Sequence, residues 1–140
     1  MSLYLGLDSS TQSLSAVVID LWTREVLLDY TINFNERLPE FGCEDGVLPN
    51  DDPQVAHSDP LLWLAALDLM CKELPEKGID VSEILAVAGS GQQHGSVYLK
   101  ANASDVLRSL SPRSTLPRQL KKALSRPTSP IWMDSSTRPQ

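Results

Sequence analysis

The chain has 140 residues, a formal net charge of −6 and a hydrophobic fraction of 41%, values typical of one globular domain with a real core. The negative charge gives no electrostatic basis for binding nucleic acid or an anionic membrane, because such partners are normally met by a basic face. Basic side chains gather between Arg108 and Arg126 with few aromatic residues among them. This stretch is therefore interpreted as a solvated helix face rather than a phosphate-binding patch.

Two cysteines, Cys43 and Cys71, are present and lack the spacing of a zinc site. Thiols without a disulfide pattern fit a reducing compartment better than a secreted scaffold. The N-terminus shows no signal-peptide pattern, and the longest apolar stretches are too short to span a bilayer. The sequence therefore predicts a cytoplasmic protein without a membrane segment.

Strand patterns dominate the start of the chain. Segments 3–8 and 14–20 are apolar, and segment 25–34 alternates apolar and polar side chains, which is typical of a half-buried strand. Short polar connections join the three segments, so we expect an antiparallel meander. The first strand is apolar on both faces and is expected to lie centrally.

The middle of the chain is predicted to hold a loop and then a helix. Residues 37–57 carry Gly, Pro, Asn and Asp with little periodicity and are expected to form a long loop. Asp59 and Pro60 suit the N-cap and first position of a helix, which we expect to close at Lys77-Gly78. The predicted core stripe of this helix is Leu64, Leu67, Cys71 and Leu74, widened by Trp63 and Met70.

Further strands and helices are expected in the second half. Residues 84–88 are predicted to form a buried strand and residues 97–99 another. Two short helices interrupted by prolines are expected within 103–124, and residues 130–134 are interpreted as a last strand. A meander, a helix and a strand parallel to the first make an α/β layered domain. Function in such domains tends to lie at the carboxyl ends of the strands.

Segment 6–13, Gly-Leu-Asp-Ser-Ser-Thr-Gln-Ser, places a carboxylate at the end of the first strand and hydroxyl side chains in the turn that follows. Backbone N–H groups and hydroxyls of such a turn can hold phosphate oxygens, while Asp8 can position a hydrated Mg²⁺. The Walker A pattern is missing. The alternative is a tight hairpin whose Asp and Ser residues serve turn chemistry alone.

Segment 89–95, Gly-Ser-Gly-Gln-Gln-His-Gly, directly follows a predicted buried strand. The side chains of Gln93 and His94 offer donors and acceptors suited to a polyol or keto sugar. The glycines would let a ligand approach the backbone closely. The alternative is that His94 is a satisfied structural residue.

Segment 132–137, Trp-Met-Asp-Ser-Ser-Thr, combines an indole with a carboxylate. The face of Trp132 can pack against the C–H side of a sugar while Asp134 accepts hydrogen bonds from its hydroxyls. The alternative is a core Trp at a strand end, with Asp134 or Ser135 as the N-cap of a helix.

These three segments occur together and in this order, and their joint pattern resembles the FGGY carbohydrate kinases. Segment 4–13 is similar to the first phosphate motif of that family. Segment 90–98 is similar to the sugar-binding signature of its xylulokinases, and segment 132–137 to a third landmark of the eukaryotic-type branch. The resemblance implies the ribonuclease-H-like α/β fold of actin and hexokinase, with a mixed sheet, an antiparallel three-strand meander and flanking helices, here incomplete.

The resemblance also implies ATP-dependent phosphorylation of D-xylulose to D-xylulose 5-phosphate, with another ketose or a polyol as the alternative substrate. By this resemblance Asp8 would organise Mg²⁺, and Thr11, Gln12 and Ser13 would face the ATP phosphates. Many family members carry Gly where Ser10 stands, so its side chain could crowd those phosphates. The ketose would be bound by His94, Gln93, Trp132 and Asp134.

In that family the catalytic aspartate and most of the adenosine pocket lie downstream of the region matched here, so no catalytic residue is nominated. Residues 1–140 are interpreted as an N-terminal kinase portion without the C-terminal nucleotide-binding domain, expected to be inactive alone. The alternatives are a non-catalytic sugar-binding module and a poorly folded remnant with exposed sheet edges. The expected partners are the sugar and ATP, without nucleic acid or membrane.

Overall fold

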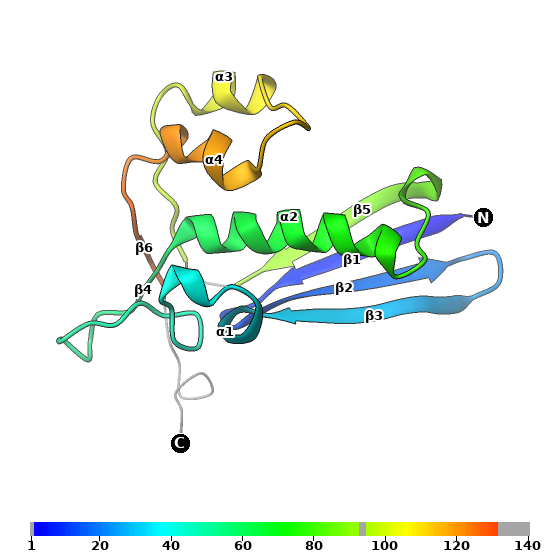
Figure 1. Ribbon diagram of the computed structural model, residues 1–140, viewed down its shortest axis with the longest axis horizontal. Helices are drawn as coiled ribbons and strands as arrows, with labels where there is room; N and C mark the ends of the chain where they lie inside the picture. The colour runs from blue at the N-terminus through cyan, green and yellow to red at the C-terminus, as the bar shows by residue number, and fades with distance from the viewer. Residues whose placement is uncertain (1, 93–94, 132–140) are drawn as a thin grey trace.

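A computed structural model describes residues 2–92 and 95–131. At its centre is a four-stranded sheet of strand order β3-β2-β1-β5 (Figure 1). The strands are β1 (Leu3–Ser9), β2 (Ser13–Asp20), β3 (Glu25–Asn33) and β5 (Ile84–Gly91). β2 runs antiparallel to both β1 and β3, whereas β5 runs parallel to β1. The predicted meander is confirmed, and β1 lies inside the sheet as predicted.

A long helix, α2 (Pro60–Glu76), lies over one face of this sheet (Figure 1). Its predicted start is confirmed, because Leu61 N donates to Asp59 Oδ1 at 2.8 Å and Pro60 takes an initial position that needs no N–H partner. Side chains of the helix and the meander together form the main core. Its central members are Leu3, Leu5, Leu14, Ala16, Val18, Ile32, Leu62, Ala66, Met70 and Leu74.

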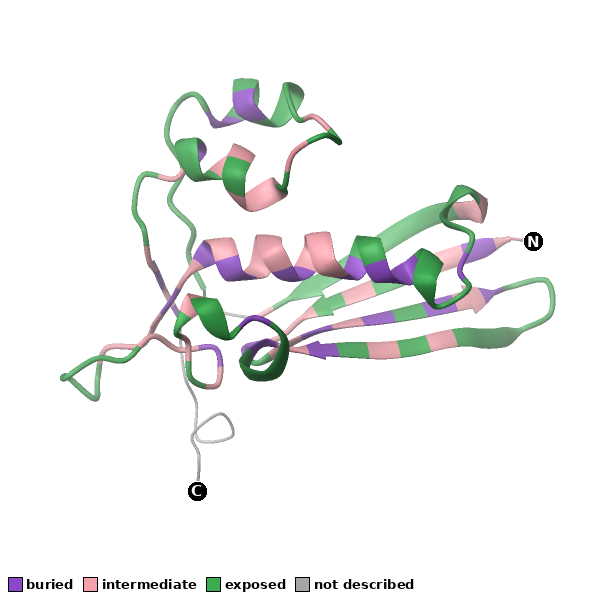
Figure 2. Cartoon of the chain, viewed as in Figure 1, coloured by how far each residue is buried: buried purple, intermediate pink, exposed green. Residues whose placement is uncertain are grey.

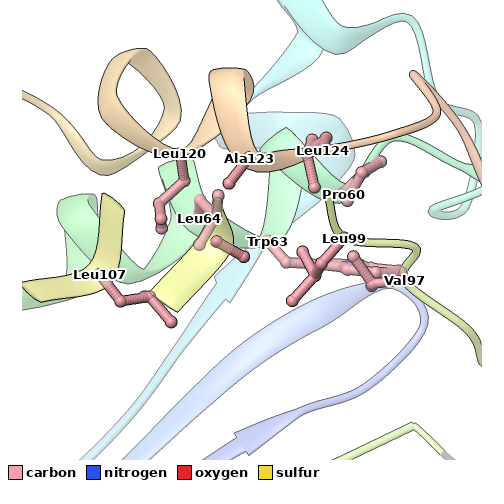
Figure 3. Close-up of a pocket in the computed structure, with 10 residues that line it drawn as sticks. Pro60, Trp63, Leu64, Val97, Leu99, Leu107, Leu120, Ala123 and Leu124 are labelled. Carbon is pink, nitrogen blue, oxygen red and sulfur yellow. The ribbon is translucent and has the colours of Figure 1, made fainter. Parts of the chain in front are cut away.

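The buried side of α2 includes the predicted core residues Met70 and Leu74 but differs from the predicted stripe at Cys71. Met70 is completely buried, whereas its neighbour Cys71 is exposed. The reason is that α2 lies between two layers. One side packs on the sheet, and on another side Trp63 and Leu64 line an apolar pocket of about 180 Å³ shared with the region of α4 (Leu116–Leu120) (Figure 3). A helix that is apolar on two sides does not reveal from its periodicity which side meets the sheet.

The remaining elements are short. They are α1 (Phe34–Arg37), η1 (Pro39–Phe41), β4 (His57–Ser58), η2 (Val81–Glu83), α3 (Ala103–Arg108), η3 (Lys121–Ala123) and β6 (Ser129–Pro130). Strand β6 pairs with β4 outside the main sheet, so the described start of the predicted last strand does not extend that sheet. Pro117 lies in the first turn of α4 rather than interrupting a helix, since that turn needs no N–H from it. Within the described ranges, no helix is long and apolar enough to cross a membrane.

Strand β5 is exposed on both faces (Figure 2). Leu85 is 63% and Val87 61% exposed, although the segment is apolar. Among the described residues, β1 is the only strand that pairs with it. The prediction of a buried strand here is therefore wrong, because α2 covers the meander and no described layer covers β5.

A polar cluster ties the edge of the meander to α2. Tyr30 Oη donates to Glu73 Oε2 at 2.6 Å, Arg37 Nη1 donates to Tyr30 Oη at 2.8 Å, and Arg37 also pairs with Glu73. Lys77 Nζ lies 3.7 Å from the centre of the Tyr30 ring. The hydrogen bond from Tyr30, followed by that from Arg37, lowers the pKa of the buried Glu73 carboxyl below its ordinary value.

We expect Glu73→Gln to destabilise the chain in a pH-dependent way. The unfolded carboxyl has a pKa of about 4.3 and the folded one a lower pKa, so its stabilisation is complete above the unfolded value and lost as the pH falls through the folded value. Urea titrations should show a cost of about 1.5–3 kcal/mol at pH 7 that shrinks below about pH 4. The exposed Glu76→Gln on the same helix is the control. An equal cost of Glu73→Gln at both pH values would contradict this account.

Candidate functional site

Asp8 lies near the C-terminal end of β1, on the sheet face that α2 leaves uncovered. The preceding Leu7 packs against the core, and successive side chains of a strand point to opposite faces. The register places Asp8 beside Ser15 of β2 and Ser90 of β5, and Ser90 Oγ donates to Asp8 Oδ1. Thr31 of β3 pairs with Ser15, and their hydroxyl oxygens are 2.8 Å apart. Each of the four strands thus contributes one residue to a polar row made of Ser90, Asp8, Ser15 and Thr31.

The polar row borders an open hollow of about 370 Å³. Its lining residues are Gly6, Leu7, Asp8, Ser15, Val17, Ala88, Gly89 and Ser90. The side-chain oxygens that could bind a metal ion here belong to the Asp8 carboxylate and to the hydroxyls of Ser15 and Ser90. This set suits Mg²⁺, because that ion usually keeps several water ligands and binds one or two carboxylates together with substrate phosphates. Within residues 2–92 and 95–131, no group of three or more His, Cys, Asp or Glu could hold a metal alone. An ion bound here would therefore take most of its ligands from water and phosphate.

The turn between β1 and β2 is closed by its own serines. Ser10 N donates to Ser13 O at 2.9 Å, and Ser10 Oγ lies 3.2 Å from Ser13 O and 3.1 Å from Ser13 Oγ. The Ser10 hydroxyl is thus held within the turn. Gln12 is exposed, and its carbonyl accepts from Phe34 N at 2.9 Å. Thr11 is only 9% exposed, so it offers the least surface of the three side chains expected to face phosphate.

A small hairpin that we did not predict from the sequence lies against Thr11. Glu44 and Val47 exchange backbone hydrogen bonds of 2.8 and 2.9 Å. Between them Asp45 and Gly46 have φ values of 51° and 80°, the positive values that a type I′ turn requires. The expectation of one long irregular loop here is therefore incomplete. The dipeptide Asp-Gly is a strong signal for this turn and could have located it.

Outside the described residues lie the four predicted sugar contacts, Gln93, His94, Trp132 and Asp134. The residues beside them are described. Gln92 N donates to Ser9 O at 2.8 Å, so the chain leaving β5 runs beside the end of the strand that carries Asp8. Ser96 N donates to Pro130 O at 3.2 Å. The described flanks of the second and third sequence segments are therefore in contact with each other.

The chain is 44% identical over 136 residues to the xylulose kinase of Rattus norvegicus and 43% identical over 137 residues to xylulose kinase 2 of Arabidopsis thaliana. It is 40% identical over 135 residues to D-xylulose kinase A of Aspergillus niger. Over nearly its whole length, the chain is homologous to xylulose kinases. The matches cover 96–97% of the chain but only 24–25% of these relatives, so the chain spans about a quarter of their length. No family model matches it.

Solved structures of sugar kinases share the fold. The xylulose kinase from Lactobacillus acidophilus superimposes with a TM-score of 0.54 at 20% identity, over 73% of this chain and 18% of that one. A gluconate kinase from the same species gives a TM-score of 0.53 at 21% identity, over 71% and 17% of the two chains. The predicted actin- and hexokinase-type fold, present here in part, is confirmed.

Proposed function

We propose that the chain is the N-terminal part of an ATP-dependent kinase that converts D-xylulose and ATP to D-xylulose 5-phosphate and ADP. The supporting observation is the similarity of 96–97% of its length to xylulose kinases at 40–44% identity. Because these relatives are about four times as long, the activity is assigned to a longer polypeptide. The catalytic base and the C-terminal nucleotide-binding domain would then lie outside residues 1–140, and the chain alone would be inactive.

Asp8 is assigned to Mg²⁺. Its carboxylate is exposed in the hollow beside the hydroxyls of Ser15 and Ser90, and the Ser90 hydrogen bond favours one orientation of it. When bound, Mg²⁺ would neutralise negative charge on the ATP phosphates. The turn that follows would face these phosphates, with Gln12 and Ser13 contributing side chains and the covered Thr11 contributing its backbone.

We assign binding of the ketose to four residues. The side chains of Gln93 and His94 would hydrogen-bond its hydroxyls and carbonyl, the ring of Trp132 would pack against it, and Asp134 would accept hydrogen bonds from it. Support comes from their flanks, because Gln92 bonds to the end of β1 and Ser96 bonds to Pro130. This would bring the sugar close to the turn that faces ATP, as direct phosphoryl transfer requires.

A cytosolic location of the protein also remains a prediction.

A chimera tests the proposal. In the chimera, residues 1–140 replace the matching segment of the rat xylulose kinase, to which the chain is 44% identical. We expect the chimera to release ADP from ATP in a D-xylulose-dependent manner, while the rat enzyme without the segment does not. A chimera that is folded, as judged by cooperative unfolding, but phosphorylates no ketose would contradict the proposal. Activity on another ketose or a polyol, but not on D-xylulose, would change the substrate and keep the reaction.

A further inference from the structure

Gly46 contacts the backbone of the turn that follows Asp8. A Cβ atom at Gly46 would lie 1.7 Å from the carbonyl oxygen of Thr11 and 2.7 Å from its carbonyl carbon. Gly46 itself is buried. No residue other than glycine fits such an approach without moving one of the two backbones. The hairpin of residues 44–47 is thus in direct contact with the β1–β2 turn.

The hairpin is itself anchored to the sheet. Asn35 Nδ2 donates to Asp45 Oδ1 and Asp45 N donates to Asn35 Oδ1, both at 3.0 Å. The adjacent Phe34 is 1% exposed in the core, and its N–H donates to the Gln12 carbonyl. The turn is therefore supported at two successive residues, by Gly46 at Thr11 and by Phe34 at Gln12.

We propose that the Asp45-Gly46 turn is a brace that fixes the β1–β2 turn, and that Gly46 is a positioning residue for the groups that would bind the ATP phosphates. The second part rests on the proposed function. Gly46 would touch no substrate and would act through Thr11. Fixed donors lose their effect when they are displaced, and a shift of about 1 Å can cost about 10²-fold in rate.

Two glycines of the same loop separate the close contact from the backbone conformation. Gly42 has a φ of 64° and Gly46 a φ of 80°, so alanine at either position is strained by a left-handed backbone. Nothing lies within 4 Å of a Cβ atom at Gly42. The difference between Gly46→Ala and Gly42→Ala therefore reports the contact with Thr11.

Amide hydrogen exchange on the 140-residue chain tests the brace itself. The amides of Ser10 and Phe34 bond to the Ser13 and Gln12 carbonyls, so they report on the turn. We expect both to exchange about tenfold faster in Gly46→Ala than in Gly42→Ala, with unchanged rates in β2 and β3. Equal rates in the two variants would overturn the brace.

A milder change keeps this test decisive should Gly46→Ala unfold the whole chain. Asn35→Ala removes both side-chain anchors of Asp45 at an exposed position and introduces no clash. Faster exchange at Ser10 in this variant, with the sheet amides unchanged, would support the brace. Unchanged exchange at Ser10 would overturn it.

Kinetics of the chimera test the positioning role. Gly46→Ala should lower kcat/KM for ATP by about 10²-fold, with KM for D-xylulose changed by less than about threefold. Gly42→Ala should stay near the parent chimera. Equal effects of the two variants would overturn the positioning role alone. An inactive parent chimera would contradict the proposed function and this role with it, whereas hydrogen exchange would still decide whether the brace exists.

Discussion

Replacing Asp8 with Asn in the chimera should lower kcat for D-xylulose phosphorylation by about 10²- to 10³-fold. Asn keeps the shape of Asp but loses the charge, and an uncharged oxygen attracts Mg²⁺ far less than a carboxylate. KM for the sugar should change little, because the sugar contacts are assigned to other residues. Steady-state kinetics over a range of Mg²⁺ concentrations would measure both effects, and the variant should require more Mg²⁺ for half-maximal rate.

Asp29→Asn is the matched control for this experiment. Asp29 is an exposed carboxylate of β3 that pairs in register with Val17, a residue that lines the same hollow as Asp8. It thus shares the open face of the sheet but stands outside the polar row. The kcat of the Asp29→Asn chimera should stay within about twofold of that of the parent chimera. An equal loss of kcat in both variants would mean that the overall charge of this sheet face matters and not Asp8 in particular. An unchanged kcat in Asp8→Asn would contradict the assignment of Asp8 to Mg²⁺ binding.

Met70→Ala should lower the free energy of unfolding by about 2–5 kcal/mol. Met70 is completely buried within the core formed by α2 and the sheet. Truncation removes most of a buried side chain and leaves a cavity that its neighbours fill only partly. Urea denaturation of the chain, followed by circular dichroism, would measure the loss as a lower midpoint at an unchanged slope.

Cys71→Ala, at the next position of the helix, provides the comparison and should cost less than about 0.5 kcal/mol. Cys71 is exposed, although the apolar periodicity of α2 placed it within the predicted core stripe. A cost for Cys71→Ala equal to that for Met70→Ala would mean that α2 packs on the sheet through the predicted stripe after all.

Much of the fold could be predicted because its signals are local. β1 is apolar from Leu3 to Leu7, β3 alternates, and Asp59 with Pro60 marks the start of α2 within two residues. The orientation of α2 about its axis could not be predicted in this way. It depends on α4, which covers a second side of the helix and lies far later in the chain, so no pattern within α2 identifies the sheet-facing side.

In the candidate site too, features with a local sequence signal could be predicted, whereas features set by contacts between distant segments could not. A carboxylate at the end of a central strand can be recognised in the sequence, and this led to Asp8. Its neighbours Ser15 and Ser90 are set by strand register, which depends on pairing between distant segments. Likewise, the dipeptide Asp45-Gly46 predicts a tight turn, but nothing within it predicts that the turn packs against Thr11.

Strand β5 also has a consequence for how molecules of this chain behave toward one another. Among the described residues its outer edge has no strand partner, and its apolar stretch, Ile-Leu-Ala-Val-Ala, carries no charge that would repel a neighbour. Another molecule can add to such an edge through backbone hydrogen bonds. Self-association through the edge of β5 is therefore expected, and Val87→Lys, which places a charge on this exposed strand, should weaken it.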